Sequence, residues 1–177
     1  AMPAPSVLGR AARIQTFISG EPGRSSNQMF ILSDAGMGKT SALVMLKLAH
    51  VTAFWPPNYS CELLKLGPKS LDRITEIPSK GRTVLLLDAF DEDPSAWRNP
   101  GERMQKVLHA SKPFLRTVIT CRTQFFRSRQ DPFFRPGFVE VEGFLCPVVY
   151  ASLFTDAQVQ KYILASFPRE SRDPAWR

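Results

Sequence analysis

A glycine-rich segment near the start of the chain has the spacing of a phosphate-binding loop. Residues 33–40 read SDAGMGKT and follow the apolar run 29–32. They match the pattern G-x-x-x-x-G-K-[ST] except at Ser33, which stands where the leading glycine is usual. A strand that turns through such a loop into a helix points several backbone N–H groups into one concavity, at the positive end of the helix dipole. Polyphosphate is the ligand that fits there.

The residue types of this segment suit a nucleotide. Glycines at 36 and 38 adopt backbone angles that are closed to other residues, so that phosphate oxygens can approach the main chain. Lys39 would reach the β- and γ-phosphates as a point charge, and the Thr40 hydroxyl would bind Mg²⁺. The predicted nucleotide-binding residues are Ser33, Asp34, Ala35, Gly36, Met37, Gly38, Lys39, Thr40, Ser41 and Arg122.

A second apolar run, residues 84–87, ends in three acids: Asp88, Asp91 and Glu92. Asp88 comes at the carboxyl end of a predicted strand, where open α/β sheets place their ligands, and is predicted to bind Mg²⁺ together with Thr40. Asp91 and Glu92 would lie near the γ-phosphate, where one of them would orient or polarise the attacking water. An ordinary strand-to-helix turn is the alternative for the loop alone, and the acids argue against it.

Arg122 directly follows another predicted strand, residues 117–121. If the strands are parallel, the end of this one converges on the same rim as the loop and Asp88. An arginine there would donate to the γ-phosphate and sense whether it is present. A structural ion pair with the acids at 91 and 92 is the alternative.

The elements that must position these residues alternate between strand and helix. Predicted strands are residues 29–32, 61–66, 83–88, 117–121 and 138–141, and predicted helices are 11–18, 39–50, 69–77, 101–112 and one that begins at 156, with Thr155 as its N-cap. The Asp-Pro and Asn-Pro pairs at 93–94 and 99–100 are interpreted as breaks. This alternation predicts a doubly wound α/β sheet, with residues 138–141 as its fifth strand.

Three parts are expected along the 177 residues. Residues 1–28 would form an N-terminal helix and a loop leading into the core, residues 29–150 the P-loop NTPase core, and residues 151–177 the start of a truncated helical region. No apolar run approaches the roughly 18 residues that cross a membrane, and no leader is visible, so we expect a cytoplasmic protein that does not associate with membranes. Cys61, Cys121 and Cys146 are predicted to be buried small hydrophobic residues.

The net charge of +7 raises the possibility of a nucleic-acid partner. In residues 122–135, arginines alternate with phenylalanines, which would neutralise and stack on a single strand. The favoured alternative is that Phe125, Phe126, Phe133 and Phe134 pack the segment onto the sheet, leaving Arg127, Arg129 and Arg135 in solvent or facing another domain.

Four segments together resemble the NTPase core of NACHT domains, within the STAND class of P-loop ATPases. Residues 34–40 resemble its phosphate loop, 87–92 (LDAFDE) its hhhhD-[GAS]-hDE signature, 118–122 its sensor strand with the arginine, and 153–162 the start of its next helical segment. The likeness spans residues 11 to about 167. It implies a P-loop NTPase fold, three-layer α/β/α with a mostly parallel five-stranded sheet. In this sheet the sensor strand lies between the phosphate-loop and Asp88 strands, and ATP or ADP binds with Mg²⁺. It also implies helical, winged-helix, sensor and effector domains elsewhere, and nucleotide-dependent homo-oligomers in innate immune or antiphage signalling.

The leading expectation is therefore an ATP-binding and hydrolysing regulatory switch module of a larger signalling protein, with slow Mg²⁺-dependent nucleoside triphosphatase activity. A P-loop ATPase that is stimulated by nucleic acid through residues 122–135 is the alternative. A phosphotransferase is disfavoured, because no acceptor-binding region is visible in the sequence and acids at 91 and 92 fit water activation better.

Overall fold

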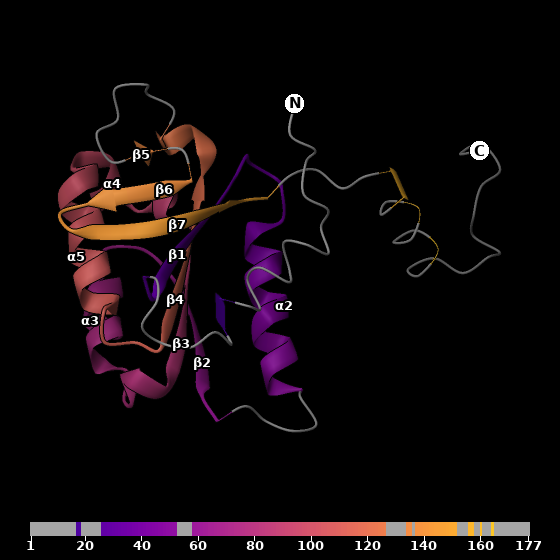
Figure 1. Ribbon diagram of the computed structural model, residues 1–177, viewed down its shortest axis with the longest axis horizontal. Coiled ribbons are helices and arrows are strands. Elements are labelled where there is room, and N and C mark those ends of the chain that lie inside the picture. Colours follow the sequence, from indigo (N-terminus) through magenta and orange to yellow (C-terminus); the bar gives the residue numbers. More distant parts are fainter. Residues whose placement is uncertain are drawn as a thin grey trace.

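The structure, a computed structural model, describes residues 17–18, 26–52, 58–126, 134–135 and 137–151, together with residues 156, 157, 160 and 164. These residues form an α/β fold built on one sheet (Figure 1). The strands are β1 (Gln28–Ser33), β2 (Ser60–Lys65), β3 (Thr83–Asp88), β4 (Arg116–Arg122), β5 (Phe134–Arg135), β6 (Phe138–Val141) and β7 (Phe144–Tyr150). The helices are α2 (Lys39–Val51), α3 (Ser70–Glu76), α4 (Pro94–Arg98) and α5 (Pro100–Ser111), with 3-10 turns η1 (Lys80–Arg82), η2 (Phe90–Glu92) and η3 (Thr123–Phe126).

The sheet is mostly parallel, as predicted. Its strand order is β2-β3-β4-β1-β7-β6-β5. The first five strands in this order are parallel to one another, and the pairs β7–β6 and β6–β5 are antiparallel. β4 lies between β1 and β3, which is the order that the resemblance implied. β1 and β3 are buried along their whole length, as expected of near-continuous apolar strands covered on both faces. The carboxyl ends of β1, β3 and β4 consequently meet at one edge.

The predicted count of five strands is wrong, because the described chain holds seven. The expected fifth strand, residues 138–141, is β6 and runs antiparallel to β7. Glu142 and Gly143, both at positive φ (41° and 86°), form the two-residue turn between them. β7 then leaves β6 and pairs in parallel with β1 through Val148, Val149 and Tyr150.

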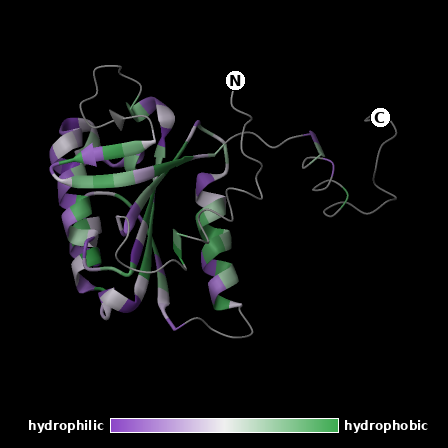
Figure 2. Ribbon diagram, viewed as in Figure 1, coloured by the Kyte–Doolittle hydropathy of each residue, from purple (hydrophilic) through white to green (hydrophobic). Residues whose placement is uncertain are grey.

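Helices cover both faces of the sheet, with α2 on one side and α3, α4 and α5 on the other (Figure 1). The most hydrophobic residues lie on the central strands between these layers (Figure 2). The larger core packs under α3 and α5, and a smaller one packs between the sheet and α2. The three-layer arrangement was predicted correctly.

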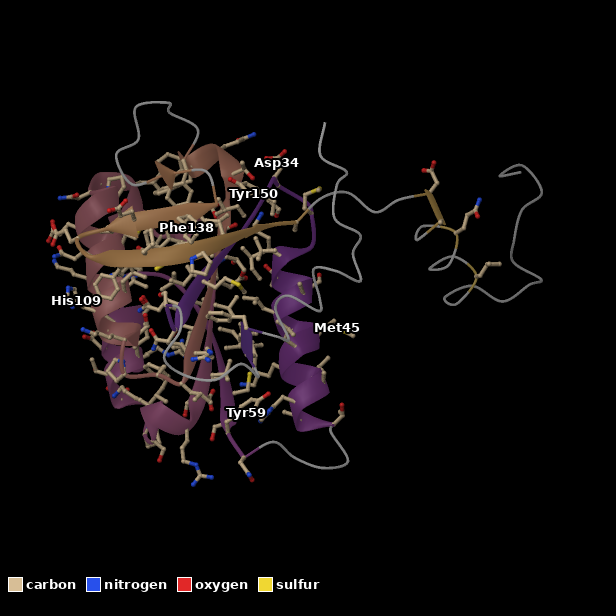
Figure 3. All side chains as sticks on the ribbon, in the orientation of Figure 1. Asp34, Met45, Tyr59, His109, Phe138 and Tyr150 are labelled. Atoms are coloured by element: carbon tan, nitrogen blue, oxygen red, sulfur yellow. The ribbon has the colours of Figure 1, made fainter. Side chains whose placement is uncertain are left out.

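Helix α2 packs less closely than its composition predicted. Of its 13 residues, only Leu43 is buried. Val44, Met45, Leu48 and Val51 are exposed, and Met45 points away from the sheet (Figure 3). From the sequence alone, apolar residues on almost every face of residues 39–50 predict a helix that is wedged against the sheet. The exposed apolar residues show that this prediction is wrong.

The two X-Pro pairs start helices rather than breaking the chain. The Asp93 side chain accepts a hydrogen bond from the Ser95 N–H, and that of Asn99 accepts one from the Glu102 N–H. The proline that follows each cap occupies the first helical position, where no N–H is needed. α4, which the sequence analysis did not predict, arises in this way.

Both ends of the chain carried predictions that lie largely outside the described residues. Of the predicted helix 11–18, only residues 17 and 18 are described, and they are helical. Residues 156, 157, 160 and 164 are helical, and they lie within the segment predicted to form a helix from 156. None of the described helices combines the length and the apolar character needed to span a bilayer.

A buried ion pair joins α4 and α5. The Asp93 side chain is fully buried, and its Oδ2 lies 2.7 Å from Arg103 Nη2. The same guanidinium donates to the Gly67 carbonyl oxygen at 2.6 Å, which ties α5 to the turn after β2. This pair holds together the elements behind the acidic turn η2.

Replacing Asp93 should destabilise the fold strongly. Asp93→Ala leaves the Arg103 charge buried without its carboxylate, so we expect the free energy of unfolding to fall by about 3–5 kcal/mol in urea denaturation. Glu102→Ala removes an exposed partner of Lys106 and should cost no more than about 1 kcal/mol. A loss below about 1 kcal/mol for Asp93→Ala would contradict this role.

Candidate functional site

The predicted phosphate loop is a tight exposed turn between β1 and α2. Gly36 and Gly38 have φ of 74° and 75°, the left-handed region that glycine adopts without strain. Gly38 is the cap residue of α2 and has no side chain with which to occupy the helix N–H groups, and the first turn of α2 contains no acidic residue. The positive end of a 13-residue helix therefore opens onto the loop.

The loop residues are placed so that a ligand can reach them. Ser33 is buried as the last residue of β1, and Met37 and Lys39 are half-buried. The remaining predicted contact residues of the loop, Asp34, Ala35, Gly36, Gly38, Thr40 and Ser41, are exposed. Figure 3 shows Asp34 at the sheet edge, close in this view to Tyr150 at the end of β7.

Lys39 folds back over its own loop. Its Nζ donates to the Ser33 carbonyl oxygen at 3.1 Å, to Ser33 Oγ at 3.1 Å and to the Asp34 carbonyl oxygen at 2.9 Å. The serine that replaces the usual glycine therefore gives the ammonium an additional oxygen. Lys39 would have to exchange some of these partners for phosphate oxygens.

Asp88 is held by side chains from two other elements. Its Oδ2 accepts a hydrogen bond from Thr40 Oγ1 of α2 at 2.7 Å, and its Oδ1 accepts one from Thr120 Oγ1 of β4 at 2.6 Å. Thr120 Oγ1 in turn accepts the Ala89 N–H at 2.9 Å. Sequence reasoning did not select Thr120, whose place beside Asp88 depends on the pairing of β3 with β4.

The two predicted magnesium ligands are thus in direct contact. A hydroxyl and a carboxylate oxygen are the hard donors that Mg²⁺ prefers, and this ion commonly keeps several waters and binds through one or two carboxylates and substrate phosphates. In the described part of the chain, no cluster of three or more His, Cys, Asp or Glu side chains suits a metal. A magnesium site of the kind predicted does not require one.

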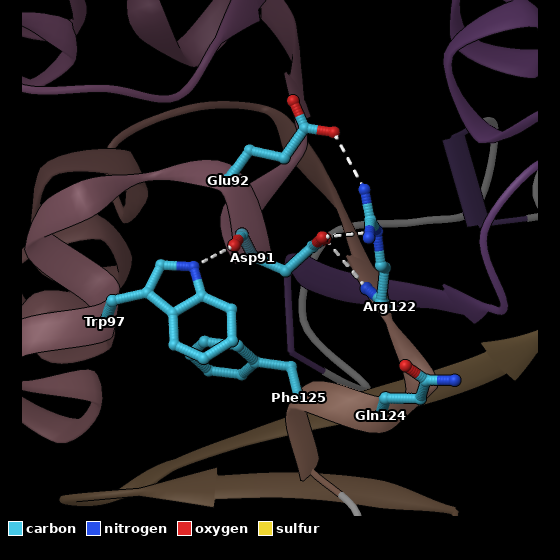
Figure 4. A pocket seen from close by; sticks show the side chains of 6 residues that line it. All are labelled: Asp91, Glu92, Trp97, Arg122, Gln124 and Phe125. Atoms are coloured by element: carbon cyan, nitrogen blue, oxygen red, sulfur yellow. Dashed lines mark hydrogen bonds and ion pairs between the residues drawn. The ribbon is translucent and has the colours of Figure 1, made fainter.

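The other two acids follow a left-handed residue, Ala89 at φ 59°, in turn η2. Asp91 is buried, and its Oδ1 accepts the backbone N–H of Arg122 at 2.8 Å, while its Oδ2 lies 2.9 Å from Arg122 Nε. Glu92 is more open, and its Oε1 lies 3.3 Å from Arg122 Nη2 (Figure 4). The ion pair considered as the alternative for Arg122 is therefore present in this structure.

Lys65 is a member of this cluster that the sequence analysis missed. It ends β2, in register with Asp88 on β3, and its Nζ lies 2.8 Å from Glu92 Oε2. The hydrogen bond from Lys65 lowers the pKa of the Glu92 carboxyl, partial burial opposes this, and Arg122 lowers it further. The same hydrogen bond raises the pKa of Lys65. Its position at the end of a strand next to Asp88 was the available signal.

A cavity of about 310 Å³ opens beside these acids. It is lined by Asp91, Glu92, Trp97, Arg122, Gln124 and Phe125 (Figure 4). The Trp97 indole N–H donates to the Asp91 carbonyl oxygen at 2.5 Å, and its ring meets Phe125 edge to face at 5.7 Å. Aromatic rings therefore form the wall of the cavity opposite the charged groups.

The phenylalanines of the basic-aromatic segment that the structure describes pack inward. Phe126 is buried and meets Phe30 of β1 edge to face, and Phe125 packs against Phe90. Phe126 is thus unavailable to a nucleic-acid base. Arg127, Arg129 and Phe133 lie outside the described residues, as do the side chains of Phe134 and Arg135.

The cysteines are buried free thiols, as predicted. Burial raises the pKa of Cys61 and Cys146 to about 11 and that of Cys121 further still. Such thiols are poor nucleophiles at neutral pH.

No protein-family model matches this sequence, and no curated protein sequence matches it. The function of the site is therefore inferred from the residues themselves.

Thr120 should contribute more to the free energy of unfolding than Thr117, another buried threonine on β4. Thr120→Val removes the hydrogen bond to Asp88 and leaves the buried Ala89 N–H without its acceptor, so we expect the free energy of unfolding to fall by about 1–3 kcal/mol. Thr117→Val is the matched control, because Thr117 donates only a long 3.4 Å bond to the Ser111 carbonyl oxygen. Equal losses in urea denaturation would contradict the supporting role of Thr120.

Proposed function

We propose that this chain is the nucleotide-binding and hydrolysing core of a P-loop ATPase of the NACHT and STAND kind, acting as a regulatory switch in a larger signalling protein. The observation that carries the proposal is the 2.7 Å contact between Thr40, at the start of α2, and Asp88, at the end of β3. It brings together two motifs 48 residues apart in the sequence, at the edge where α/β sheets bind ligands.

The loop and the helix end would bind the nucleotide. Amide N–H groups of residues 34–40 would hold the phosphate oxygens, and Lys39 would turn from the carbonyl oxygens of its own loop to the β- and γ-phosphates. Thr40 and Asp88 would hold the magnesium ion. When bound, Mg²⁺ would neutralise charge on the phosphates.

Glu92 is the better of the two candidate bases. Asp91 is buried and both of its oxygens are taken up by the backbone N–H and the guanidinium of Arg122. Its role would be to position that arginine. Glu92 is about two-fifths exposed, so water can reach it. We assign Glu92 the orientation and deprotonation of the attacking water.

Arg122 connects the phosphate to the acids. It lies beside Ser33 in the register of β1 and β4, so both the loop and the acidic turn are within its neighbourhood. A γ-phosphate would compete with Glu92 for its Nη2 group, whereas Nε would stay on Asp91. The presence of the γ-phosphate would thus alter the pairing of Glu92, which is what a nucleotide-dependent switch requires.

The wider role follows from the resemblance. Nucleotide state would set the arrangement of helical, winged-helix, sensor and effector domains in the parent protein, drive its homo-oligomerisation in the cytoplasm, and be reset by hydrolysis. Equal effects of ATP and ADP on the assembly of the full-length protein would refute the switch.

Lys39→Ala should abolish nucleotide binding, because the loop loses the cation that faces the phosphates. Calorimetric titration with ATP, ADP and GTP, each with Mg²⁺, measures this. Lys47→Ala is the matched control, since Lys47 lies on the same helix but pairs with Glu62. Unchanged affinity in Lys39→Ala, or equal losses in the two variants, would contradict the assigned role of Lys39.

Glu92→Gln should preserve ATP binding and lower kcat by about 10²–10⁴-fold, the range contributed by a general base. Steady-state phosphate release measures turnover, and calorimetry verifies binding. Glu102→Gln, which changes an exposed glutamate on α5, is the control and should turn over like the unmodified protein. If Glu92→Gln retains full turnover, Glu92 is not the base.

A further inference from the structure

The Glu92 carboxylate is paired with a cation on each of its oxygens. Lys65 Nζ lies 2.8 Å from Oε2, and Arg122 Nη2 lies 3.3 Å from Oε1. These cations come from the ends of β2 and β4, which are different strands, and both approach the turn that follows β3. The strand register places them there, since Lys65 is opposite Asp88 and β4 is the other neighbour of β3.

The two cations differ in what else they contact. Arg122 is anchored on Asp91 through Nε at 2.9 Å, and its backbone N–H donates to the same carboxylate. Its contact with Glu92 is the longer one. Lys65 makes the shorter contact, and it reaches Glu92 from an exposed position, with 68% of its side chain accessible. Lys65 is therefore the principal partner of the Glu92 carboxylate in this structure.

The two ion pairs make Glu92 a poorer base for deprotonating the attacking water. A general base must present an oxygen lone pair to the water it deprotonates, and a carboxylate that is stabilised by two cations is the weaker base. An approaching γ-phosphate would draw Arg122 away from Oε1, but it leaves the contact with Lys65 in place. A second step is then needed before Glu92 is fully available.

We infer that Lys65 is a positioning residue that restrains Glu92, so that hydrolysis requires the Lys65–Glu92 ion pair to open. The inference rests on the proposed function and adds to the same site an inhibitory ion pair, Lys65–Glu92, which acts as a brake on hydrolysis. If Lys65 instead orients Glu92 for catalysis, replacing Lys65 should lower kcat, whereas a restraint on Glu92 predicts that kcat rises.

The size of the effect follows from the exposure of the pair. Exposed lysine–carboxylate pairs are weak, and opening this one should change the rate by about two- to fivefold. Among the described residues, Lys65 forms its ion pair with Glu92 and not with the loop residues that are assigned to the phosphates. Its removal should therefore act on kcat and leave KM for Mg-ATP unchanged.

The test is steady-state hydrolysis of Mg-ATP by the full 177-residue chain and its variants. Lys65→Met should raise kcat by about two- to fivefold at constant KM, and Lys65→Arg, which restores the cation, should return kcat to the starting value. Lys106→Met is the matched control, because Lys106 forms an exposed pair with Glu102 on α5; it should leave kcat unchanged. In the background of Glu92→Gln, Lys65→Met should have no effect.

The possible outcomes separate the brake from the proposed function. Unchanged or lower kcat in Lys65→Met, with Mg-ATP still bound in calorimetry, overturns the brake alone. The same holds if Lys65→Met still accelerates hydrolysis in the Glu92→Gln background. Turnover that appears only in Lys65→Met supports the brake. If the unmodified chain and Lys65→Met both fail to bind Mg-ATP, the proposed function and the brake fall together.

Discussion

Two hydrogen bonds to the Asp88 carboxylate join the elements on which the candidate site depends. Thr40 brings the start of α2 to one oxygen, and Thr120 brings β4 to the other. Because Asp88 ends a strand that is buried along its whole length, its position is fixed by the core rather than by the loop. The loop, the acidic turn and the arginine on β4 are all positioned with respect to this one carboxylate.

Charges at this edge of the sheet are balanced among the side chains themselves. Asp91 and Glu92 share Arg122, Glu92 also holds Lys65, and Lys39 is turned onto the carbonyl oxygens of its own loop. A polyphosphate would compete for these cations instead of filling a ready-made positive pocket. Binding would then be accompanied by a rearrangement of ion pairs, which is the physical basis proposed here for coupling nucleotide state to hydrolysis and to the rest of a parent protein.

The sequence predicted the features that depend on local pattern. β1 and β3 are apolar runs, each of β1, β3 and β4 ends in a predicted site residue, and a glycine-rich loop before a helix is recognisable from spacing alone. The places of Thr120 and Lys65 beside the acids were not predicted, because they depend on the exact register between strands. Strand β7, which pairs in parallel with β1, was missed for two reasons. The turn that leads into it, Glu142-Gly143, is not one of the usual hairpin sequences, and Pro147 lies inside the strand, where proline is uncommon. Helix α2 was wrongly predicted to be covered on almost every face, because an apolar composition does not show which parts of the chain pack against a helix.

The central claim is that the loop before α2 binds the phosphates of a nucleotide. It is tested most directly by recording backbone amide NMR shifts of this chain during titration with Mg²⁺ and a non-hydrolysable ATP analogue. The account predicts saturable shifts concentrated in residues 34–41, together with changes at Arg122 and Glu92. Shifts confined to other parts of the chain, or no shifts at millimolar analogue, would contradict it.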